Sequence, residues 1–355
     1  MAGSVQLKMS MRPERWSREV GGAGFAADRL SPIAMAAGAV TLGFVGEGAA
    51  EQAGWWLFVV SLFVFGMPHG GLDLLLARRL TRRRASTWRR VAGLYLATIG
   101  AAGLALWAIP MWTLTAFAAL TAMHFGLADH RDLLEDGRDG PAPNLAAPSM
   151  LAGGIGRGLF MLGLPLACDA AGVLATLDGA RAMLGVDGRS PAEGDLGFVG
   201  WAAVSCGALL TAAGVAAPPN RHRRAPHATR HLLEAAALVV AAWALPAITY
   251  VALYFVFWHS LRHFTRVLRL EPVTEKGGPG ATPVRLAPAL LRLHLWSLPL
   301  TVPVVAALLL IGGPGLGLQT PRQWATLVLL SFVVLTPAHH LLVEWTYARS
   351  VARGV

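Results

Sequence analysis

Histidine is the residue type in this chain whose number and placement could support chemistry. The sequence contains eleven histidines, and several of them lie inside apolar stretches rather than in polar loops. Ionisable side chains within apolar, membrane-spanning segments are energetically costly, so they are candidates for function. Neutral imidazole is a good ligand for iron, copper or zinc. The six histidines of this kind are His69, His124, His259, His263, His339 and His340.

The spacing of these residues predicts one metal site. His259 and His263 are four residues apart, which places both imidazoles on one face of a helix. Asp73 follows His69 by four residues, where its carboxylate could accept the second ring N–H of His69 and fix the tautomer of that ligand. We therefore predict that the metal ligands, and the catalytic residues, are His69, His124, His259 and His263. We expect Asp73, His339 and His340 to lie behind the ligands or to line the pocket.

The identity of the metal is left open by these residues alone. The absence of thiolate clusters argues against iron–sulfur centres and structural zinc sites. Four imidazoles on an octahedral ferrous ion would leave about two positions vacant, enough for dioxygen beside a substrate. A tetrahedral zinc ion closed by four histidines would have no vacancy, and a structural site of this kind is hard to explain inside a helix bundle. Oxygen chemistry on iron is therefore the favoured hypothesis.

Glycines surround the predicted ligands. Small residues let two helices approach each other closely, and they can also leave room for a bulky substrate beside a metal. The sequence fits both interpretations. The glycines concerned are Gly66, Gly70, Gly71 and Gly126.

The elements that carry these residues are predicted to be transmembrane helices. Of the 355 residues, 55% are hydrophobic and 14% are charged, whereas about a quarter of residues are charged in soluble domains. The mean hydropathy is +0.52. These values exclude a soluble enzyme and a disordered chain, and they predict an all-α polytopic bundle. Apolar runs predict ten spans: 31–48, 55–77, 91–109, 111–128, 150–168, 196–217, 231–246, 247–268, 287–311 and 323–347.

Two prolines allow two helix counts. Pro110 and Pro246 could each separate two helices, which gives ten, or each kink one helix, which leaves eight crossings. The predicted organisation is an N-terminal cytoplasmic tail over 1–30, one transmembrane catalytic domain over 31–347 and a short tail over 348–355. The Gly/Pro-rich stretches at 137–149 and 277–283 are predicted to be loops.

The basic residues predict the orientation in the membrane. The net charge of +10 comes largely from short arginine clusters beside apolar spans, which is typical of cytoplasmic loops and not of nucleic-acid binding. With the clusters at 78–90, 221–224 and 262–269 inside, both termini lie in the cytoplasm. The acidic segment that begins at Asp129 is then expected to be a cytoplasmic loop. In this topology the predicted ligands lie about 6 to 13 Å from the cytoplasmic ends of their helices, at one common depth.

Four motifs in the chain resemble the Brp/Blh family of bacterial and archaeal β-carotene 15,15'-dioxygenases. The resemblance covers residues of about 55 to 347 and is strongest at His69 and at His259 with His263. The motifs are Pro68-His69-Gly70-Gly71-Leu72-Asp73, His124-Phe125-Gly126 followed by Asp129, Trp258-His259-Ser260 with Arg262-His263, and Pro337-Ala338-His339 followed by Glu344-Trp345.

The resemblance implies an enzyme of the cell inner membrane that uses Fe(2+) and O2 to split the central double bond of β-carotene into two molecules of all-trans-retinal. It also implies that the four predicted histidines bind the iron. A retinal-binding rhodopsin is the kind of partner that would accept this product. A polyene dissolved in the lipid bilayer would enter sideways, and aromatic side chains could line its path. The candidates for this pocket are Phe65, Phe125, Tyr254 and Trp258.

Other histidine-rich membrane proteins remain as alternatives. A di-iron hydroxylase or desaturase would need about eight histidines in repeated clusters, and this chain has too few at matching depth. A haem-binding electron carrier would use paired axial histidines. A metal or proton transporter would place its site near the bilayer midplane, usually between inverted repeats, and no such repeats are visible in the sequence. These alternatives therefore rank below oxygenation.

Overall fold

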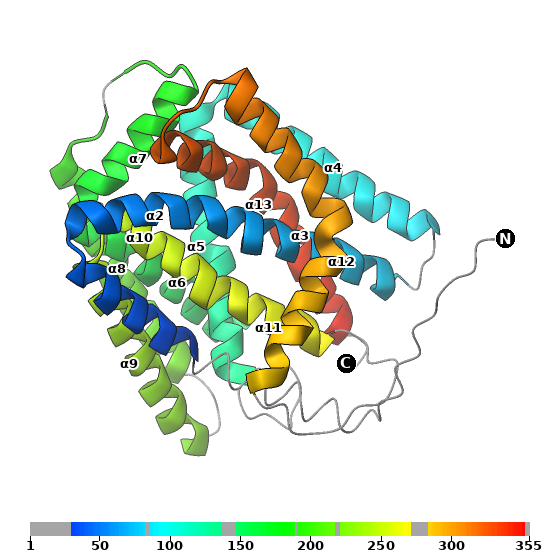
Figure 1. Ribbon diagram of the computed structural model, residues 1–355. Coiled ribbons are helices and arrows are strands. Elements are labelled where there is room, and N and C mark those ends of the chain that lie inside the picture. The colour runs from blue at the N-terminus through cyan, green and yellow to red at the C-terminus, as the bar shows by residue number, and fades with distance from the viewer. Residues whose placement is uncertain are drawn as a thin grey trace.

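The protein folds into a bundle of helices (Figure 1). The computed structural model describes residues 30–81, 85–135, 147–188, 190–216, 221–270 and 283–351. The described residues contain no β-strand, and the all-α prediction is confirmed. The predicted tails lie mostly outside the described residues, as do most of 137–149 and nearly all of 277–283. The helices are a first one over Leu30–Phe44, α2 (Glu47–Ser61), α3 (Met67–Leu80), α4 (Ala85–Ala108), α5 (Pro110–Glu135), α6 (Pro148–Cys168), α7 (Ala170–Met183), α8 (Glu193–Ala216), α9 (Arg221–Ala244), α10 (Ala247–Leu253), α11 (Leu261–Leu270), α12 (Pro283–Leu310) and α13 (Pro321–Val351).

Three π-helical turns, which are wider than α-helical turns, continue these helices. The turn η1 (Leu62–Gly66) joins α2 to α3, η2 (Tyr254–Ser260) joins α10 to α11, and η3 (Ile311–Gly315) follows α12. Counted as continuous segments, the described residues therefore form eleven helices, one more than the sequence predicts. Turns of this kind are rare and are frequently found at functional sites. Two of the three lie beside or contain predicted ligands.

The prolines at the two uncertain positions separate helices and do not kink them. Pro110 is the first residue of α5, and Pro246 directly precedes α10. Proline is tolerated at such positions because its missing N–H would have no partner within the helix. The alternative with eight crossings, in which each proline bends one continuous helix, is therefore not supported.

Helix α7 is the element that the sequence prediction missed. It has only 14 residues, too few to cross a bilayer, and it carries charged side chains, so it does not appear as an apolar run. Asp169 caps its N-terminus by accepting a hydrogen bond from the Gly172 amide at 2.9 Å. The other carboxylate oxygen of Asp169 accepts from the Ala247 amide at 2.7 Å, which links the starts of α7 and α10.

Seven of the described helices are long and apolar enough to cross a membrane, which fits a membrane protein. Three predicted spans form helices that are not among these seven. The first, Leu30–Phe44, is shorter than the others, and the helices over 231–246 and 247–268 carry buried charged side chains that lower their hydropathy. The seven are Glu47–Arg78, Ser86–Ala108, Pro110–Leu133, Pro148–Cys168, Glu193–Ala216, His294–Gly315 and Pro321–Arg349.

Close packing of α5, α6 and α8 depends on glycine. A Cβ atom added at Gly126 would overlap the backbone oxygen of Gly154 on α6, and one at Gly207 would press on the backbone of Gly156 and Phe160. Helices that approach this closely are typical of membrane bundles with small residues at their interfaces. This packing fixes α5, which carries His124, against α6.

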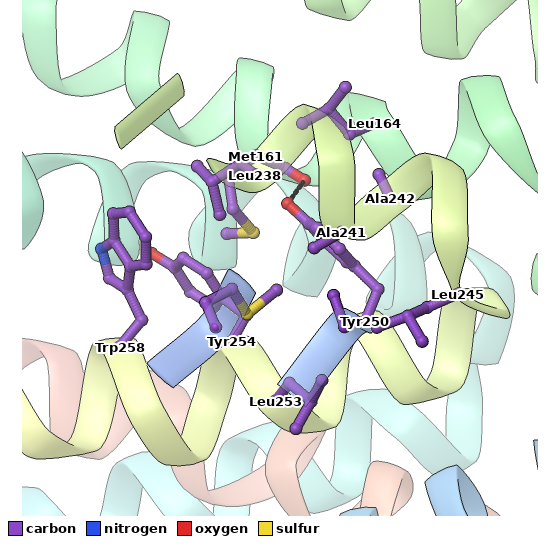
Figure 2. Packing of buried hydrophobic residues seen from close by; sticks show 12 residues of the cluster. Met161, Leu164, Leu238, Ala241, Ala242, Leu245, Tyr250, Leu253, Tyr254 and Trp258 are labelled. Carbon is purple, nitrogen blue, oxygen red and sulfur yellow. Dashed lines mark hydrogen bonds between the residues drawn. The ribbon is translucent and has the colours of Figure 1, made fainter. Parts of the chain in front are cut away.

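A buried aromatic face anchors the segment from α10 to η2. Figure 2 shows Tyr250, Tyr254 and Trp258, which follow one another at four-residue spacing. The Tyr250 hydroxyl donates a hydrogen bond to the backbone oxygen of Met161 on α6 at 3.0 Å. Since this face packs against α6, the residues one position further along, such as His259, are directed to another side of the helix.

Candidate metal centre and substrate cavity

The six predicted histidines converge where α3, α5, η2, α11 and α13 meet, and all of them are buried. The ring centroid of His69 lies 4.8 Å from those of His263 and His339 and 5.8 Å from that of His259. The ring of His124 lies 5.2 Å from His259 and 4.9 Å from His339. We call this group, with Asp73, the histidine cluster: His69, Asp73, His124, His259, His263, His339 and His340.

The π-helical turn before His69 holds its imidazole. Within η1 the Met67 amide donates to the carbonyl oxygen of Leu62, five residues back. The Nδ1 atom of His69 lies 2.8 Å from the Phe65 carbonyl oxygen. A carbonyl oxygen only accepts hydrogen bonds, so Nδ1 must carry the proton. The Nε2 atom of His69 therefore keeps its lone pair, which is the form that binds a metal.

Asp73 contacts two histidines, but they are not the one predicted. Its Oδ1 lies 3.2 Å from His263 Nε2, and its Oδ2 lies 2.8 Å from His339 Nδ1. The prediction that Asp73 orients His69 is wrong, because the Phe65 carbonyl already takes the Nδ1 proton of His69. Neither contact has hydrogen-bond geometry in this structure, but a carboxylate can only accept, so protons on His263 Nε2 and His339 Nδ1 would leave the lone pairs on His263 Nδ1 and His339 Nε2. The carboxylate role predicted for Asp73 therefore applies to different imidazoles.

His340 is bonded to the outer side of His124. The two Nδ1 atoms lie 3.0 Å apart, so one ring donates to the other and Nε2 of His124 points elsewhere. This placement fits the prediction that His340 orients a neighbouring ligand.

His339 lies nearer the centre of the cluster than the sequence predicts. One ligand atom from each of His69, His259 and His339 can be chosen so that all lie within 4.8 Å of one another.

The donor atoms of this cluster suit a transition metal. Within the described part of the chain, six buried ring nitrogens of the cluster make no hydrogen bond, and two of them, His263 Nε2 and His339 Nδ1, face Asp73. The other four are His124 Nε2, His259 Nε2, His263 Nδ1 and His339 Nε2. A buried polar atom without a partner is unfavourable by about 1–3 kcal/mol, so four such nitrogens at one place require an explanation. A metal ion held by the His69, His259 and His339 side chains, whose ligand atoms can lie within 4.8 Å of one another, would give such nitrogens a partner. An all-nitrogen donor set suits iron, copper or zinc and does not suit calcium or magnesium.

A cavity of 680 Å³ opens beside the histidine cluster, within the range of roughly 300–1,000 Å³ for ligand pockets. His69, His124, His259 and His339 contribute to its wall, and the remaining lining is mostly apolar. Residues from α7 and from α12 line it, together with residues from α3, α4, α5 and α13. The cavity therefore reaches between several helices, with four histidines in its wall.

Two of the four residues predicted to line the pocket do so. Phe125 and Tyr254 line the cavity, and the Phe125 ring lies 4.1 Å from that of His259. Phe65 and Trp258 do not line it, which corrects the prediction. Phe65 lies against His294, with ring centroids 6.2 Å apart. The Trp258 side chain is fully buried on the opposite face of η2, beside Tyr254 (Figure 2).

Further aromatic residues of the cavity were not predicted. Phe255 follows Tyr254 directly, and Phe332 lies on α13, 5.1 Å from Phe255 between ring centroids. Trp88 and Tyr95 line the cavity from α4. Their seven-residue spacing, two helical turns, is a signal that sequence reasoning could have used.

A charged cluster lies on the other side of η2. Asp129 and Asp132, expected in a cytoplasmic loop, are buried within α5, which extends to Glu135. Asp129 Oδ2 accepts hydrogen bonds from the Tyr254 hydroxyl at 3.0 Å and from Trp258 Nε1 at 2.9 Å. The Arg262 Nη2 atom donates to Glu234 Oε1 at 2.7 Å. We call these residues the charged cluster: Asp129, Arg157, Arg230, Glu234 and Arg262.

Comparisons with known proteins agree with this geometry. Residues 60–347 match the family model described as beta-carotene 15,15'-dioxygenase. A protein of Halobacterium salinarum named "Probable beta-carotene 15,15'-dioxygenase Blh" is 29% identical over 311 residues, covering 84% of this chain and 86% of that protein. No solved structure matches the chain.

Proposed function

Because the chain belongs to the β-carotene 15,15'-dioxygenase family and is a carotenoid dioxygenase, we propose that it uses Fe(2+) and O2 to cleave the central double bond of β-carotene into two all-trans-retinal molecules. The observation that carries this proposal is the group of buried, unpartnered imidazole nitrogens beside a large apolar cavity. The nitrogens provide a site for iron, and the cavity provides a site for the polyene.

In this proposal the iron ligands are His69, His124, His259 and His263, as the family resemblance implies, and the geometry adds His339, which lies with His69 and His259. Asp73 orients His263 and His339 through its two oxygens, and His340 orients His124. Bound ferrous iron would supply the activation of dioxygen, because octahedral iron with four imidazoles has about two vacant positions. The protein's contribution would be preorganisation, which is clearest at His69, because the Phe65 carbonyl oxygen takes its Nδ1 proton and leaves the lone pair on Nε2 before the metal arrives.

The apolar cavity would position the polyene and exclude water. Phe125 and Phe255 lie 4.1 and 5.8 Å from the His259 ring between centroids, so a polyene stacked on them would pass beside the ligands. The cleavage needs no acid or base from the protein in this scheme. Asp73 acts through the imidazoles that it orients, and the aromatic walls act by holding the scissile bond near the metal.

The membrane would supply the substrate. Two residues of the cavity wall, Leu96 on α4 and Leu300 on α12, are 66% and 40% exposed, which indicates that the cavity reaches the outer surface between these helices. α4 and the apolar part of α12 are membrane-span candidates. A carotenoid dissolved in the lipid bilayer of the cell inner membrane could then enter laterally. Retinal would leave by the same apolar route, toward a partner such as a retinal-binding rhodopsin. Both termini are proposed to lie in the cytoplasm.

Expression in cells that accumulate β-carotene tests this function. We expect the cells to lose colour and retinal to appear in their extracts. Alanine at His69, His124, His259 or His263 should abolish retinal formation while the protein still accumulates in membranes. Retention of activity by any one variant would remove that residue from the ligand set. Hydroxylated or desaturated carotenoids of unchanged chain length, without retinal, would contradict the proposal.

A further inference from the structure

The four glycines around the histidine cluster differ in which atoms lie near the position that a Cβ atom would occupy. A Cβ atom at Gly66 would lie 3.1 Å from Leu62 and 3.2 Å from Phe332, and one at Gly71 would lie 3.3 Å from Ser297 and Thr301. Gly126 packs directly against the backbone of α6. These three glycines are explained by close packing. At Gly70, by contrast, no described atom outside the local helix lies within 4 Å of the Cβ position.

Packing and backbone conformation therefore give no reason for glycine at position 70. Gly70 lies within α3, and it is not among the described glycines with positive φ. Glycine inside a helix is less favourable than alanine by about 1 kcal/mol. A helical glycine that neither permits a close approach nor adopts a special conformation must be explained in another way.

The cavity supplies that explanation. Gly70 is partly exposed and lines the cavity, next to His69 in sequence. Leu74, one helical turn further along α3, lines the same cavity, as do the exposed Leu96 and Leu300. The open space at Gly70 is thus part of the cavity beside His69. A side chain there would narrow the cavity beside a predicted iron ligand.

We propose that Gly70 is a specificity-determining residue, whose missing side chain leaves the space in which the conjugated chain of a carotenoid lies beside His69. This inference rests on the proposed function, because it assumes that a long polyene occupies the cavity. It adds a size limit: any side chain at position 70 displaces the polyene from the metal ligands. Gly70 does not contact the metal, so the metal site should be unaffected by the change.

Replacing Gly70 by Ala and by Leu tests the inference, with Gly100→Ala and Gly100→Leu as matched controls. Gly100 also lies inside a helix, α4, and no described atom outside the local helix lies within 4 Å of its Cβ position. It is exposed and does not line the cavity. Each purified variant is measured for thermal stability, for iron content and for binding of β-carotene to the metal-free protein, followed by visible absorption. Cleavage is measured as kcat/KM.

We expect Gly70→Ala to raise thermal stability, as Gly100→Ala does, because alanine favours the helix. At the same time it should weaken β-carotene binding, and Gly70→Leu should lower kcat/KM by about tenfold or more, with iron content unchanged. Gain of stability with loss of binding is a result that a purely structural glycine would not give. The Gly100 variants should bind and cleave normally.

Two outcomes would overturn the inference. Normal carotenoid binding and cleavage by Gly70→Leu would show that the space is not occupied by substrate. A loss of iron equal to the loss of binding would show that position 70 supports the metal site instead. Failure of the wild-type protein to cleave any carotenoid is a different result, since it contradicts the proposed function, and binding to the metal-free protein then still tests the role of Gly70.

Discussion

The histidine cluster and the charged cluster are neighbours in this bundle, and they differ in whether opposite charges face each other. In the charged cluster all four carboxylate oxygens of Asp129 and Glu234 face a cation or a hydrogen-bond donor. In the histidine cluster four ring nitrogens face no protein partner among the described residues. Both clusters are buried, so burial alone does not distinguish a binding site from a structural one.

The difference assigns the two clusters different tasks. A paired set of buried charges holds helices together, and removal of one partner leaves an uncompensated charge. An unpaired set of neutral imidazoles adds little stability to the protein alone, but it is ready to bind a metal. The segment from η2 to α11 contributes to both. Trp258 contacts the charged cluster and Arg262 belongs to it, while His259 and His263 belong to the histidine cluster. Substitutions in the two clusters should therefore have separable effects.

The largest expected effect on activity is that of His259→Ala. Removal of this imidazole takes one ring from the group formed with His69 and His339. Substitution of residues that only orient ligands costs about 10–100-fold, so loss of a ligand should lower carotenoid cleavage by more than that. Retinal formation and bound iron are measured on the purified protein. His294→Ala, a histidine outside the cluster, is the control and should keep both. A fully active His259→Ala variant would contradict the assignment.

The next effect is on stability and concerns Glu234→Ala. Its carboxylate accepts from Arg157, Arg230 and Arg262. Removal of one partner from a buried ionic group destabilises a protein by about 3–5 kcal/mol. We expect poor accumulation and a lower melting temperature in detergent, with a normal iron content in the folded fraction. Glu193→Ala, an exposed acid on α8, should melt like the wild type. Unchanged stability combined with loss of iron would reverse the assignment of the two clusters.

Sequence patterns predicted the helices and the convergence of the histidines, because both follow from apolar periodicity and from the rarity of ionisable groups in apolar spans. They did not predict the partner of Asp73. Four-residue spacing from His69 places both residues on one face of α3, but the Phe65 carbonyl competes for the His69 proton, and only the packing of α11 and α13 brings His263 and His339 to the carboxylate.

The errors at the cavity have a similar origin. Tyr254 and Trp258 have the same spacing as Phe255 and His259, so spacing alone did not show that Trp258 contacts Asp129 away from the cavity while the other three line it. Asp129 itself was placed in a loop, because an acidic residue at the end of an apolar run is usually solvated. Its arginine partners lie on α6 and α11, far away in the sequence, so their proximity is visible only in the fold.

A smaller effect is expected for Asp73→Asn. The amide can still accept a hydrogen bond from one imidazole, but it cannot accept from both His263 and His339 through two oxygens. One ring should then lose its fixed tautomer, and we expect iron affinity to fall by about 10–100-fold. Competition with a chelator during iron loading measures this, and activity should recover at high iron concentration. Asp195→Asn, an exposed change on α8, is the control. Lost activity that excess iron does not restore would argue against an orienting role.

The smallest effect is expected for Tyr254→Phe, which tests the boundary between the two clusters. The Tyr254 ring lines the cavity, while its hydroxyl donates to Asp129 in the charged cluster. Phenylalanine keeps the ring contacts with Phe125 and Trp258, at 5.6 and 5.9 Å between centroids, and removes only the hydrogen bond. A hydrogen bond to a charged group contributes about 1.5–3 kcal/mol. Trp258 and two arginines still contact Asp129, so the stability loss should be near the lower value.

Because the Tyr254 hydroxyl points away from the histidines, kcat/KM and iron content should not change. A loss of activity at unchanged stability would mean that the hydroxyl takes part in the reaction, and the separation between the paired and unpaired clusters would then fail at this residue.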